Sequence, residues 1–199
     1  MSAVDAAISA LRAGELAVIP TDTVYGLAAD GRSEDAARAL YAAKGRSAIQ
    51  PTALLFASVD LLEEHVPELP ARARAMARAL LPGPLTLVLP NPARRFGWLN
   101  ERRPDAVGAR VPAIPGAGGD VLIALGVLVA TSANLPGQPD PRRVEDVPPA
   151  IREGVTVVVD GGELPGPPST VVDRTTAEPG VLREGAVPAR EILARLTDF

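Results

Sequence analysis

The sequence has 199 residues, of which 47% are hydrophobic and 22% charged, a formal net charge of −4 at pH 7 and no cysteine. This length and composition suit a single domain, residues 1–199, with its own core, and the lack of cysteine excludes disulfides, thiolate metal sites and cysteine nucleophiles. The acidic balance offers no global attraction for nucleic acid, so contact with a nucleotide or an RNA requires a local basic patch.

Hydrophobic periodicity and turn residues predict the following elements in chain order. A helix ends at Gly14, a strand covers 15–20, a helix capped by Ser33 ends at Lys44 and Gly45, and a strand covers 51–58. Helices follow at 59–66 and 71–81, strands at 85–90 and 106–112, a helix around 120–126 and a strand at 127–131. After a proline-rich bend come strands at 155–160, 169–173 and 180–184 and a helix at 189–196. Because helices and strands mix without strict alternation, we expect an α/β fold of the mixed α+β kind, with helices packed on one twisted mixed β-sheet.

The N-terminal segment carries Asp5 and Arg12 inside an amphipathic pattern of apolar residues. This pattern is typical of a helix rather than of a signal peptide. Since no apolar run of the sequence is long enough to cross a bilayer, we expect a cytoplasmic protein that makes no contact with a membrane.

Several common catalytic motifs are absent from the sequence. It contains none of the patterns G-x-x-x-x-G-K-[ST], G-x-G-x-x-G, H-E-x-x-H or G-x-S-x-G. The single histidine, His65, ends a short predicted helix, and we interpret it as a helix-terminal or partly exposed residue rather than as a member of a catalytic triad. No metal site built from side chains is expected. These exclusions favour phosphoryl or nucleotidyl transfer, which places charges and hydroxyls around a substrate.

Polar residues recur where predicted apolar strands end: at 21–23, at Arg110, at Ser132 and Asn134, and at Ser169. Each of these alone has a structural explanation as a cap or a side-chain-to-backbone turn. Lys44, Arg46 and Arg183 also lie beside predicted element ends, although Lys44 before Gly45 is equally typical of a helix C-terminus. If these cations converge they form an anion pocket, because arginine grips phosphate or carboxylate with two hydrogen bonds.

Seven short motifs occur in a recognisable order between about Leu16 and Val187: "PTDTVYGL", "KGR", "PGPLTLVLP", "VGARVP", "TSANLPGQP", "PSTVVD" and "LREGAV". Together they resemble the YrdC-like threonylcarbamoyl-AMP synthases. The KxR and SxN signature of that family is matched by Lys44, Arg46, Ser132 and Asn134. The resemblance covers nearly the whole chain.

The resemblance implies a twisted mixed sheet with an open cleft and a nucleotidyltransferase reaction. In that reaction L-threonine, bicarbonate and ATP give threonylcarbamoyl-AMP and pyrophosphate, with Mg²⁺ carried on the phosphates. The product supplies downstream transfer proteins that modify an adenosine of certain tRNAs. The residues that the resemblance assigns to catalysis and ATP are Lys44, Arg46, Ser132 and Asn134, with Arg183 as a further ATP contact. Those that it assigns to threonine are Thr23, Arg110, Ala130, Thr131 and Ser169.

The residue chemistry agrees with this assignment. Arg110 suits the carboxylate of threonine, and Thr23 or Ser169 suits its hydroxyl, since an analogue without the hydroxyl leaves buried groups unpaired. We therefore interpret the polar stretch 21–26 as the floor of an amino-acid pocket to which Thr23, and with it Thr21 and Tyr25, is delivered, with Gly26 allowing a tight turn behind it.

Four positions depart from the family pattern. Ser47 follows Arg46 where proline is usual, Leu55 and Ile114 stand where many relatives have histidine, and Thr131 begins "TSAN" where "PSAN" is common. These departures leave open a paralogue of the same fold that makes another carbamoyl or acyl adenylate.

A binding module without synthase activity is a second alternative. Residues 93–104, "ARRFGWLNERRP", interleave four arginines with Phe96 and Trp98, a pattern that can hold tRNA or double-stranded RNA by charge and stacking. The interpretation that we favour is a solvated loop with two buried aromatic residues.

Overall fold

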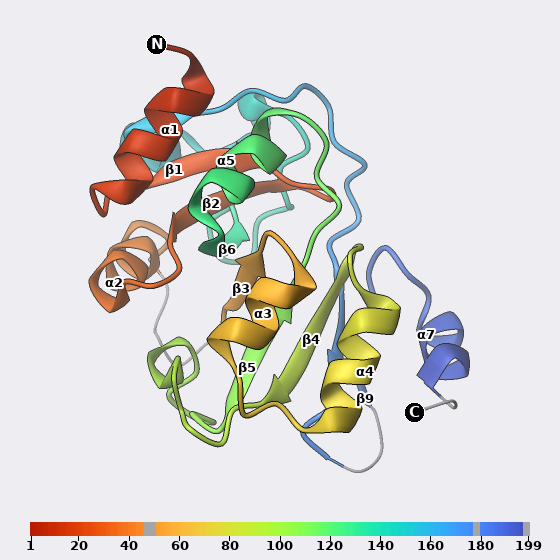
Figure 1. Cartoon of the computed structure of the whole chain (residues 1–199). Coiled ribbons are helices and arrows are strands. Elements are labelled where there is room, and N and C mark those ends of the chain that lie inside the picture. Colours follow the sequence, from red (N-terminus) through yellow and green to blue (C-terminus); the bar gives the residue numbers. More distant parts are fainter. Residues whose placement is uncertain (46–50, 177–179, 197–199) are drawn as a thin grey trace.

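The computed structural model of the chain describes residues 1–45, 51–176 and 180–196. Within these residues nine strands form one sheet in the order β7-β1-β2-β6-β3-β5-β4-β8-β9. The sheet is mixed: β1/β7, β3/β5 and β4/β8 are parallel pairs, and the other five pairs are antiparallel. The mixed α/β fold predicted from the sequence is thereby confirmed (Figure 1).

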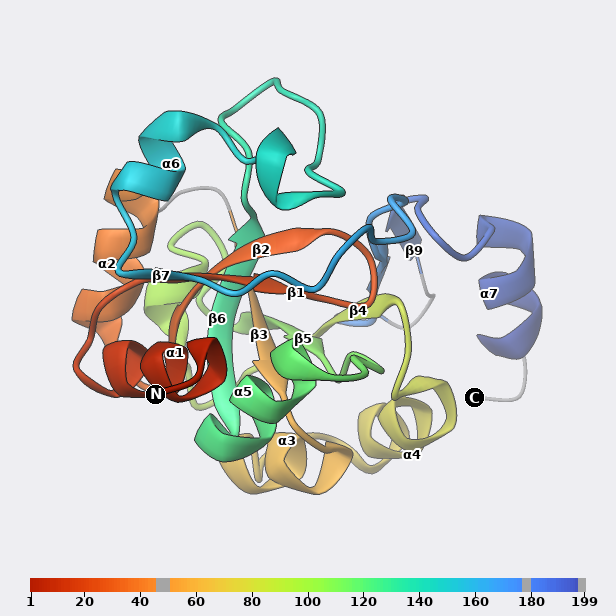
Figure 2. The ribbon, with the colours of Figure 1, turned by 90° about the horizontal axis from the view of Figure 1, so that it is seen from above.

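The strands are β1 (Ala17–Pro20), β2 (Tyr25–Asp30), β3 (Ala53–Phe56), β4 (Leu85–Pro90), β5 (Ala106–Arg110), β6 (Val127–Ser132), β7 (Val157–Val158), β8 (Thr170–Asp173) and β9 (Gly180–Arg183). The helices are α1 (Ala3–Arg12), α2 (Glu34–Ala43), α3 (Val59–His65), α4 (Ala71–Leu80), α5 (Ala117–Leu125), α6 (Pro149–Glu153) and α7 (Ala189–Leu196). In both views α1 and α7 lie toward opposite ends of the sheet (Figure 2).

Local sequence explains the main helix ends. Ser2 caps α1 in a reciprocal capping box with Asp5, and the Ser33 hydroxyl accepts from the Ala36 amide at 3.2 Å at the start of α2. Lys44 and Gly45 end α2 as the sequence predicts, with Gly45 at a φ of 62°.

Side-chain alternation along the strands builds two apolar layers. Leu85, Leu87 and Leu89 of β4 face the larger core with α2, α3 and α4, whereas Thr86 and Val88 face the opposite side. On that opposite side α1 and α5 pack against each other and bury the smaller core over β1, β2 and β6. A cleft lies on the same face, where Gly108 of β5 and Val171 of β8 line it.

Two predictions about the first hairpin are wrong. The stretch from Tyr25 is not the end of a strand but a strand of its own, β2, and the turn between β1 and β2 occupies residues 21–24. Gly26 therefore pairs with Ser132 inside the sheet and does not form the turn. A Cβ on Gly26 would stand 3.4 Å from the Thr21 methyl, so glycine here leaves room for Thr21. The strand predicted at 155–160 is shorter, since β7 holds only two residues.

Candidate active site

The cleft has a volume of about 620 Å³ and is lined by residues of seven strands, β2, β3, β4, β5, β6, β8 and β9. Gly108 lines the cleft without a side chain of its own, which leaves space there. A Cβ at this position would lie 3.2 Å from the Ala53 Cα of the neighbouring strand. Nine of the ten residues assigned from the sequence line it: Thr23, Lys44, Arg110, Ala130, Thr131, Ser132, Asn134, Ser169 and Arg183. The tenth, Arg46, lies outside the described residues, as does Ser47.

One end of the cleft is organised around Lys44, the single lysine of the sequence. Its Nζ donates to Thr131 Oγ1 at 3.2 Å, Ser132 Oγ at 3.3 Å and Asn134 Oδ1 at 2.9 Å, and also to the Ser132 carbonyl. Lys44 thus has two roles, since its backbone ends α2 while its buried side chain reaches β6. The predicted helix C-terminus is confirmed, and the role of Lys44 toward an anion stays a prediction.

Asn134 has a fixed orientation at this end. Its Nδ2 donates to the Gln138 carbonyl at 2.6 Å and to Asp140 Oδ1 at 3.2 Å. The amide oxygen is therefore turned toward Lys44 and the Ser132 hydroxyl, which donates to it at 2.7 Å. Asp140 lines the cleft as well and orients the SxN signature from behind.

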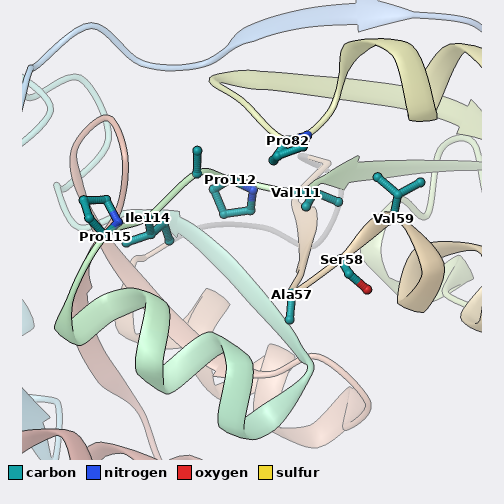
Figure 3. A pocket seen from close by; sticks show the side chains of 9 residues that line it. Ala57, Ser58, Val59, Pro82, Val111, Pro112, Ile114 and Pro115 are labelled. Atoms are coloured by element: carbon teal, nitrogen blue, oxygen red, sulfur yellow. The ribbon is translucent and has the colours of Figure 1, made fainter.

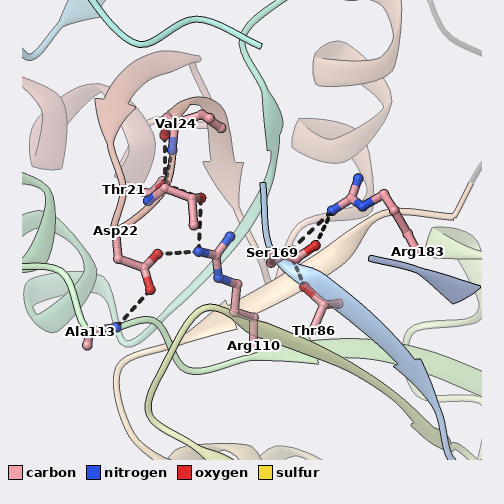
Figure 4. A network of polar contacts seen from close by, with 9 residues as sticks. Thr21, Asp22, Val24, Thr86, Arg110, Ala113, Ser169 and Arg183 are labelled. Atoms are coloured by element: carbon pink, nitrogen blue, oxygen red, sulfur yellow. Dashed lines mark hydrogen bonds and ion pairs between the residues drawn. The ribbon is translucent and has the colours of Figure 1, made fainter. Parts of the chain in front are cut away.

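The other end of the cleft is organised around Arg110, the last residue of β5 (Figure 4). Its Nη2 donates to Thr23 Oγ1 at 3.1 Å and forms an ion pair with Asp22 Oδ1. Asp22 Oδ2 in turn accepts from the Ala113 amide at 3.2 Å. The side chains of Arg110 and Asp22 are only 9% and 8% exposed, so this pair is withdrawn from bulk water.

Burial dominates the electrostatics of Arg110. It lowers the pKa of the guanidinium, the nearby charge of Arg183 lowers that pKa further, and the Asp22 carboxylate acts in the opposite direction. The Arg110 Nε atom is buried without a hydrogen-bond partner among the described residues. An unpaired buried donor is costly to the folded state.

Ser169 and Arg183 extend this end toward the edge of the sheet (Figure 4). Arg183 Nη2 donates to the Ser169 carbonyl at 2.8 Å and to its hydroxyl at 3.3 Å, and the hydroxyls of Ser169 and Thr86 are 2.8 Å apart. Arg183, which the family resemblance assigns to ATP, thus lies beside Ser169 and acts electrostatically on Arg110.

The expectation that Tyr25 reaches the pocket is wrong. Its side chain is fully buried. Its hydroxyl oxygen accepts from the Gly161 amide at 2.9 Å, and its one hydrogen faces two acceptors, the Gly162 carbonyl at 2.8 Å and Asp160 Oδ1 at 3.1 Å. Burial raises the pKa of Tyr25. The residue joins β2 to the segment at 160–162 and has no place in the cleft, whereas Thr21 does line it.

Sequence reasoning missed several cleft residues: Thr52, Thr86, Asn100, Arg102, Arg103 and Asp140. Thr86 carried a signal, because it is the polar member of an alternating strand whose leucines face the core. Asp22 was considered only as a turn residue, and its pairing with Arg110 depends on contact between residues 88 positions apart.

Three departures from the family pattern lie in described residues. Leu55 is buried in the smaller core and also lines the cleft. Ile114 does not line the cleft and instead lines a second hollow. Thr131 supplies one of the oxygens that contact Lys44. Of the three, Thr131 and Leu55 are thus positioned to alter the cleft.

In the aromatic and basic stretch at 93–104, the aromatic rings pack against each other and two of the arginines form ion pairs. Phe96 is buried, and Trp98 meets it edge-on with ring centroids 6.2 Å apart. Arg95 forms an ion pair with Glu68, and Arg103 pairs with Asp173 at 3.0 Å. The favoured interpretation of two buried aromatic residues is confirmed for Phe96, whereas Trp98 is only partly buried.

His65 also lies away from the cleft. Its Nδ1 is 2.8 Å from the Leu61 carbonyl, one turn earlier in α3, and its ring packs 5.8 Å from that of Phe56. The interpretation of His65 as a helix-terminal, partly buried residue is confirmed.

A second hollow of about 550 Å³ lies on the far side of the loop that follows Arg110 (Figure 3). Val111, Pro112 and Ile114 form one wall, and Ser58, whose hydroxyl caps α3, contributes a hydroxyl. Ionisable side chains are absent from the residues that line it. The charged groups that can hold a polar substrate are therefore in the cleft.

The described residues contain no group of three or more metal-ligating side chains. Asp140 is the one carboxylate among the described residues that line the cleft. A divalent cation here therefore needs ligands from a substrate. In the same residues no helix is both long and apolar enough to cross a membrane.

The fold and the cleft define a mixed α/β domain in which cationic and hydroxyl side chains gather between strand ends. A family model of the Sua5, YciO and YrdC proteins, described as "Telomere recombination", matches residues 9–185. The chain belongs to this family.

Relatives of known name agree with this. A threonylcarbamoyl-AMP synthase of Pyrococcus abyssi is 37% identical over 187 residues, which cover 92% of this chain and 54% of the relative. The structure of P. abyssi Sua5 complexed with L-threonine superposes with a TM-score of 0.85 at 35% identity, covering 97% of this chain and 56% of that one. Escherichia coli YciO gives a TM-score of 0.82 at 25% identity, covering 94% and 91%. This chain therefore spans about half the length of the Pyrococcus proteins and nearly all of YciO.

Proposed function

We propose that this chain is a threonylcarbamoyl-AMP synthase, which makes threonylcarbamoyl-AMP and pyrophosphate from L-threonine, bicarbonate and ATP. The observation that carries the proposal is the convergence of Lys44, Arg110 and Arg183 on one cleft from three distant parts of the sequence. The name of the Pyrococcus synthase and the L-threonine in the Sua5 complex support the same substrates.

Threonine is proposed to bind at the Arg110 end. A free amino acid is a zwitterion without net charge, and the Arg110–Asp22 pair is also balanced in charge. The threonine carboxylate is assigned to the Arg110 guanidinium, which lines the cleft and can bind a carboxylate through paired N–H donors. Thr23 and Ser169 are the candidates for the threonine hydroxyl, and the strand backbone at Ala130 and Thr131 lies alongside.

ATP is proposed to bind between Lys44 and Arg183, with Arg46 as a further contact. The amine of threonine adds to carbon dioxide derived from bicarbonate and loses a proton, which gives a carbamate. A carbamate oxygen then attacks the α-phosphorus while the bond to the bridging oxygen breaks and pyrophosphate leaves. Two anions must meet in this step, so cations that neutralise and align them lower the barrier.

Lys44, Ser132 and Asn134 are proposed to act as one unit in that step. A lysine at about 4 Å from a phosphate oxygen gains roughly 4 kcal/mol at an effective dielectric constant near 20. Mg²⁺ bound to the phosphates supplies further neutralisation, and Asp140 is the cleft carboxylate that can contact it. The product is proposed to pass to transfer proteins that modify tRNA.

The test is release of pyrophosphate from ATP with each amino acid in turn, with and without bicarbonate. We expect L-threonine with bicarbonate to exceed every other amino acid. A different preferred amine identifies the paralogue alternative, for which the departures at Leu55 and Thr131 are the specific features. ATP turnover that is independent of amino acid and bicarbonate overturns the proposal.

A further inference from the structure

Arg174, the residue that follows β8, has no partner for its charge. Its backbone amide continues the sheet by donating to the Val88 carbonyl at 2.8 Å. The residue is only 7% exposed, and its Nη1 atom is buried without a hydrogen-bond partner among the described residues. The carboxylate next to it in the sequence, Asp173, pairs with Arg103 instead. A buried guanidinium without an anion is costly to the folded state.

The register of the sheet places Arg174 beneath the first turn of α4. β8 runs parallel to β4 with Asp173 beside Val88. The next position of each strand brings Arg174 beside Leu89. Leu89 faces the larger core, which α4 covers, and the cleft lies on the opposite face. Because the chain turns from α4 directly into β4 at residues 81–84, the first turn of α4 lies over the end of β4 (Figure 1).

The first turn of α4 adds to this positive charge. Pro70 precedes it and makes no side-chain hydrogen bond, and the turn holds no acidic residue. The free amides at a helix N-terminus carry a partial positive charge, which acidic side chains usually balance. Here the second residue of the helix is Arg72 instead. Burial lowers the pKa of the Arg174 guanidinium, and the charge of Arg72 lowers that pKa further, so the two cations are close enough to repel each other.

Other arginines of this region find acceptors within the protein. Arg74 donates to the Leu69 carbonyl at 3.0 Å, and Arg95 forms an ion pair with Glu68. The side chain of Arg174 has neither kind of contact among the described residues. Two guanidinium groups and a helix N-terminus together suit a ligand with several acceptor oxygens and more than one negative charge. A phosphate dianion has both.

We propose that Arg174, Arg72 and the first turn of α4 form a binding site for a phosphate dianion. The site is separate from the cleft and does not depend on the proposed function. The ligand enters beside Arg72, which is exposed, and its oxygens accept from the arginine side chains and from the free amides of the helix. Inorganic phosphate and the terminal phosphate of a larger molecule share this chemistry, and the choice of ligand in the test tells them apart.

The test is the melting temperature of the whole chain as inorganic phosphate replaces chloride at constant ionic strength. A ligand that binds only the folded state raises this temperature. We expect a rise of about 3 °C or more for the wild type at roughly ten times the half-saturating phosphate concentration. Arg174→Met removes the charge but keeps an apolar stem under α4, and it is expected to lose the rise. Arg152→Gln, which removes an exposed arginine of α6, is the control and is expected to keep it.

Lys44→Met separates this site from the cleft, where the phosphates of ATP are proposed to bind. In this variant the rise with inorganic phosphate is expected to stay within about 1 °C of that of the wild type, because Lys44 contacts residues 131–134 and not α4. If Arg174→Met does not fold, Arg72→Gln takes its place, since Arg72 is exposed on the helix. Phosphate is expected to bind this variant about fivefold or more weakly.

An RNA oligonucleotide with a 5′-phosphate, compared with the same RNA without it, distinguishes the two sources of the phosphate. Tighter binding of the phosphorylated RNA that is lost in Arg174→Met assigns the site to a terminal phosphate. Equal binding of the two RNAs, together with the rise in melting temperature, assigns it to free phosphate.

Three results overturn the proposal. The first is a wild type that responds neither to inorganic phosphate nor to the 5′-phosphate of the RNA. The second is a response that persists in folded Arg174→Met or a phosphate affinity that is unchanged in Arg72→Gln. The third is a response that is lost in Lys44→Met, which would place the phosphate in the cleft. None of these measurements involves pyrophosphate release, so the proposed function and this site can fail independently.

Discussion

The two ends of the cleft hold their cations in different ways. At one end Lys44 reaches from a helix terminus and contacts hydroxyl, carbonyl and amide oxygens of β6 and the turn after it. At the other end Arg110 is buried in direct contact with the Asp22 carboxylate. A flexible ammonium among neutral oxygens suits phosphates that move during a reaction, whereas a rigid, charge-balanced guanidinium suits one small zwitterion. The proposed function therefore assigns the two substrates to two different physical means of recognition within one cavity.

The largest expected effect is at the Lys44 end. Lys44→Met keeps the aliphatic stem but removes the charge, so pyrophosphate release is expected to fall by about a thousandfold, because a cation opposite the transferring phosphate is lost. Threonine affinity, measured by calorimetry, is expected to stay within about threefold, because the contacts described for Lys44 go to residues 131–134, whereas Arg110 is held by Asp22 and Thr23. Arg152→Gln on α6, an exposed cation outside the cleft, is the control and should leave both unchanged. If Lys44→Met loses affinity for ATP and for L-threonine equally, the two ends of the cleft do not bind their substrates separately.

The next effect is at the Arg110 end. Asp22→Asn leaves a buried guanidinium without its anion, which is expected to lower the free energy of unfolding by about 3 kcal/mol and threonine affinity by tenfold or more. Urea unfolding and titration with L-threonine measure these. ATP affinity serves as the internal control, and a variant that loses ATP but keeps threonine contradicts the assignment of the two ends.

A substitution of Tyr25 tests whether this residue belongs to the Arg110 end of the cleft. Tyr25→Phe removes a hydroxyl that binds 160–162, so the free energy of unfolding is expected to fall by about 1–2 kcal/mol. The KM values for both substrates are expected to stay within about twofold, because the hydroxyl points away from the cleft. A selective rise in the KM for threonine would contradict the placement of Tyr25 outside the cleft.

The smallest effect concerns the rim near Arg103. Burial raises the pKa of Asp173, but hydrogen bonds from Thr175 and Arg103 outweigh it, so the pKa is held below its ordinary value of 3.8. A carboxyl whose pKa is lowered by folding stabilises the protein above its unfolded pKa and loses this effect as the pH falls through the folded value. The free energy of unfolding of the wild type relative to Asp173→Asn is therefore expected to be constant from pH 7 to about 5 and to decline below pH 4. A constant difference down to pH 2 contradicts the contacts described for Asp173.

The sequence predicted most elements correctly because their signals are local. The Ser33 cap, the Gly45 terminus and the alternation of leucines in β4 each depend on a few neighbouring residues. It missed β2 because "YGLAAD" follows a polar turn and has no alternation, since both of its faces are buried. Burial on both faces depends on the rest of the fold and is not visible in the segment.

The candidate site was predictable to a different extent. The motifs identified nine residues that do line one cleft, which confirms that these residues converge. The direction of the Tyr25 side chain and the pairing of Asp22 with Arg110 could not be predicted, because each depends on a partner more than 80 residues away. Pairings at that distance require the strand order of the sheet.

The proposed separation of the two ends of the cleft, one for ATP and the other for L-threonine, can be tested directly. Calorimetric titration of Lys44→Met and Thr23→Ala with L-threonine and with ATP measures it. We expect Lys44→Met to lose ATP and keep L-threonine, and Thr23→Ala to lose L-threonine and keep ATP. Parallel loss of both ligands in both variants, with the fold intact, would contradict it.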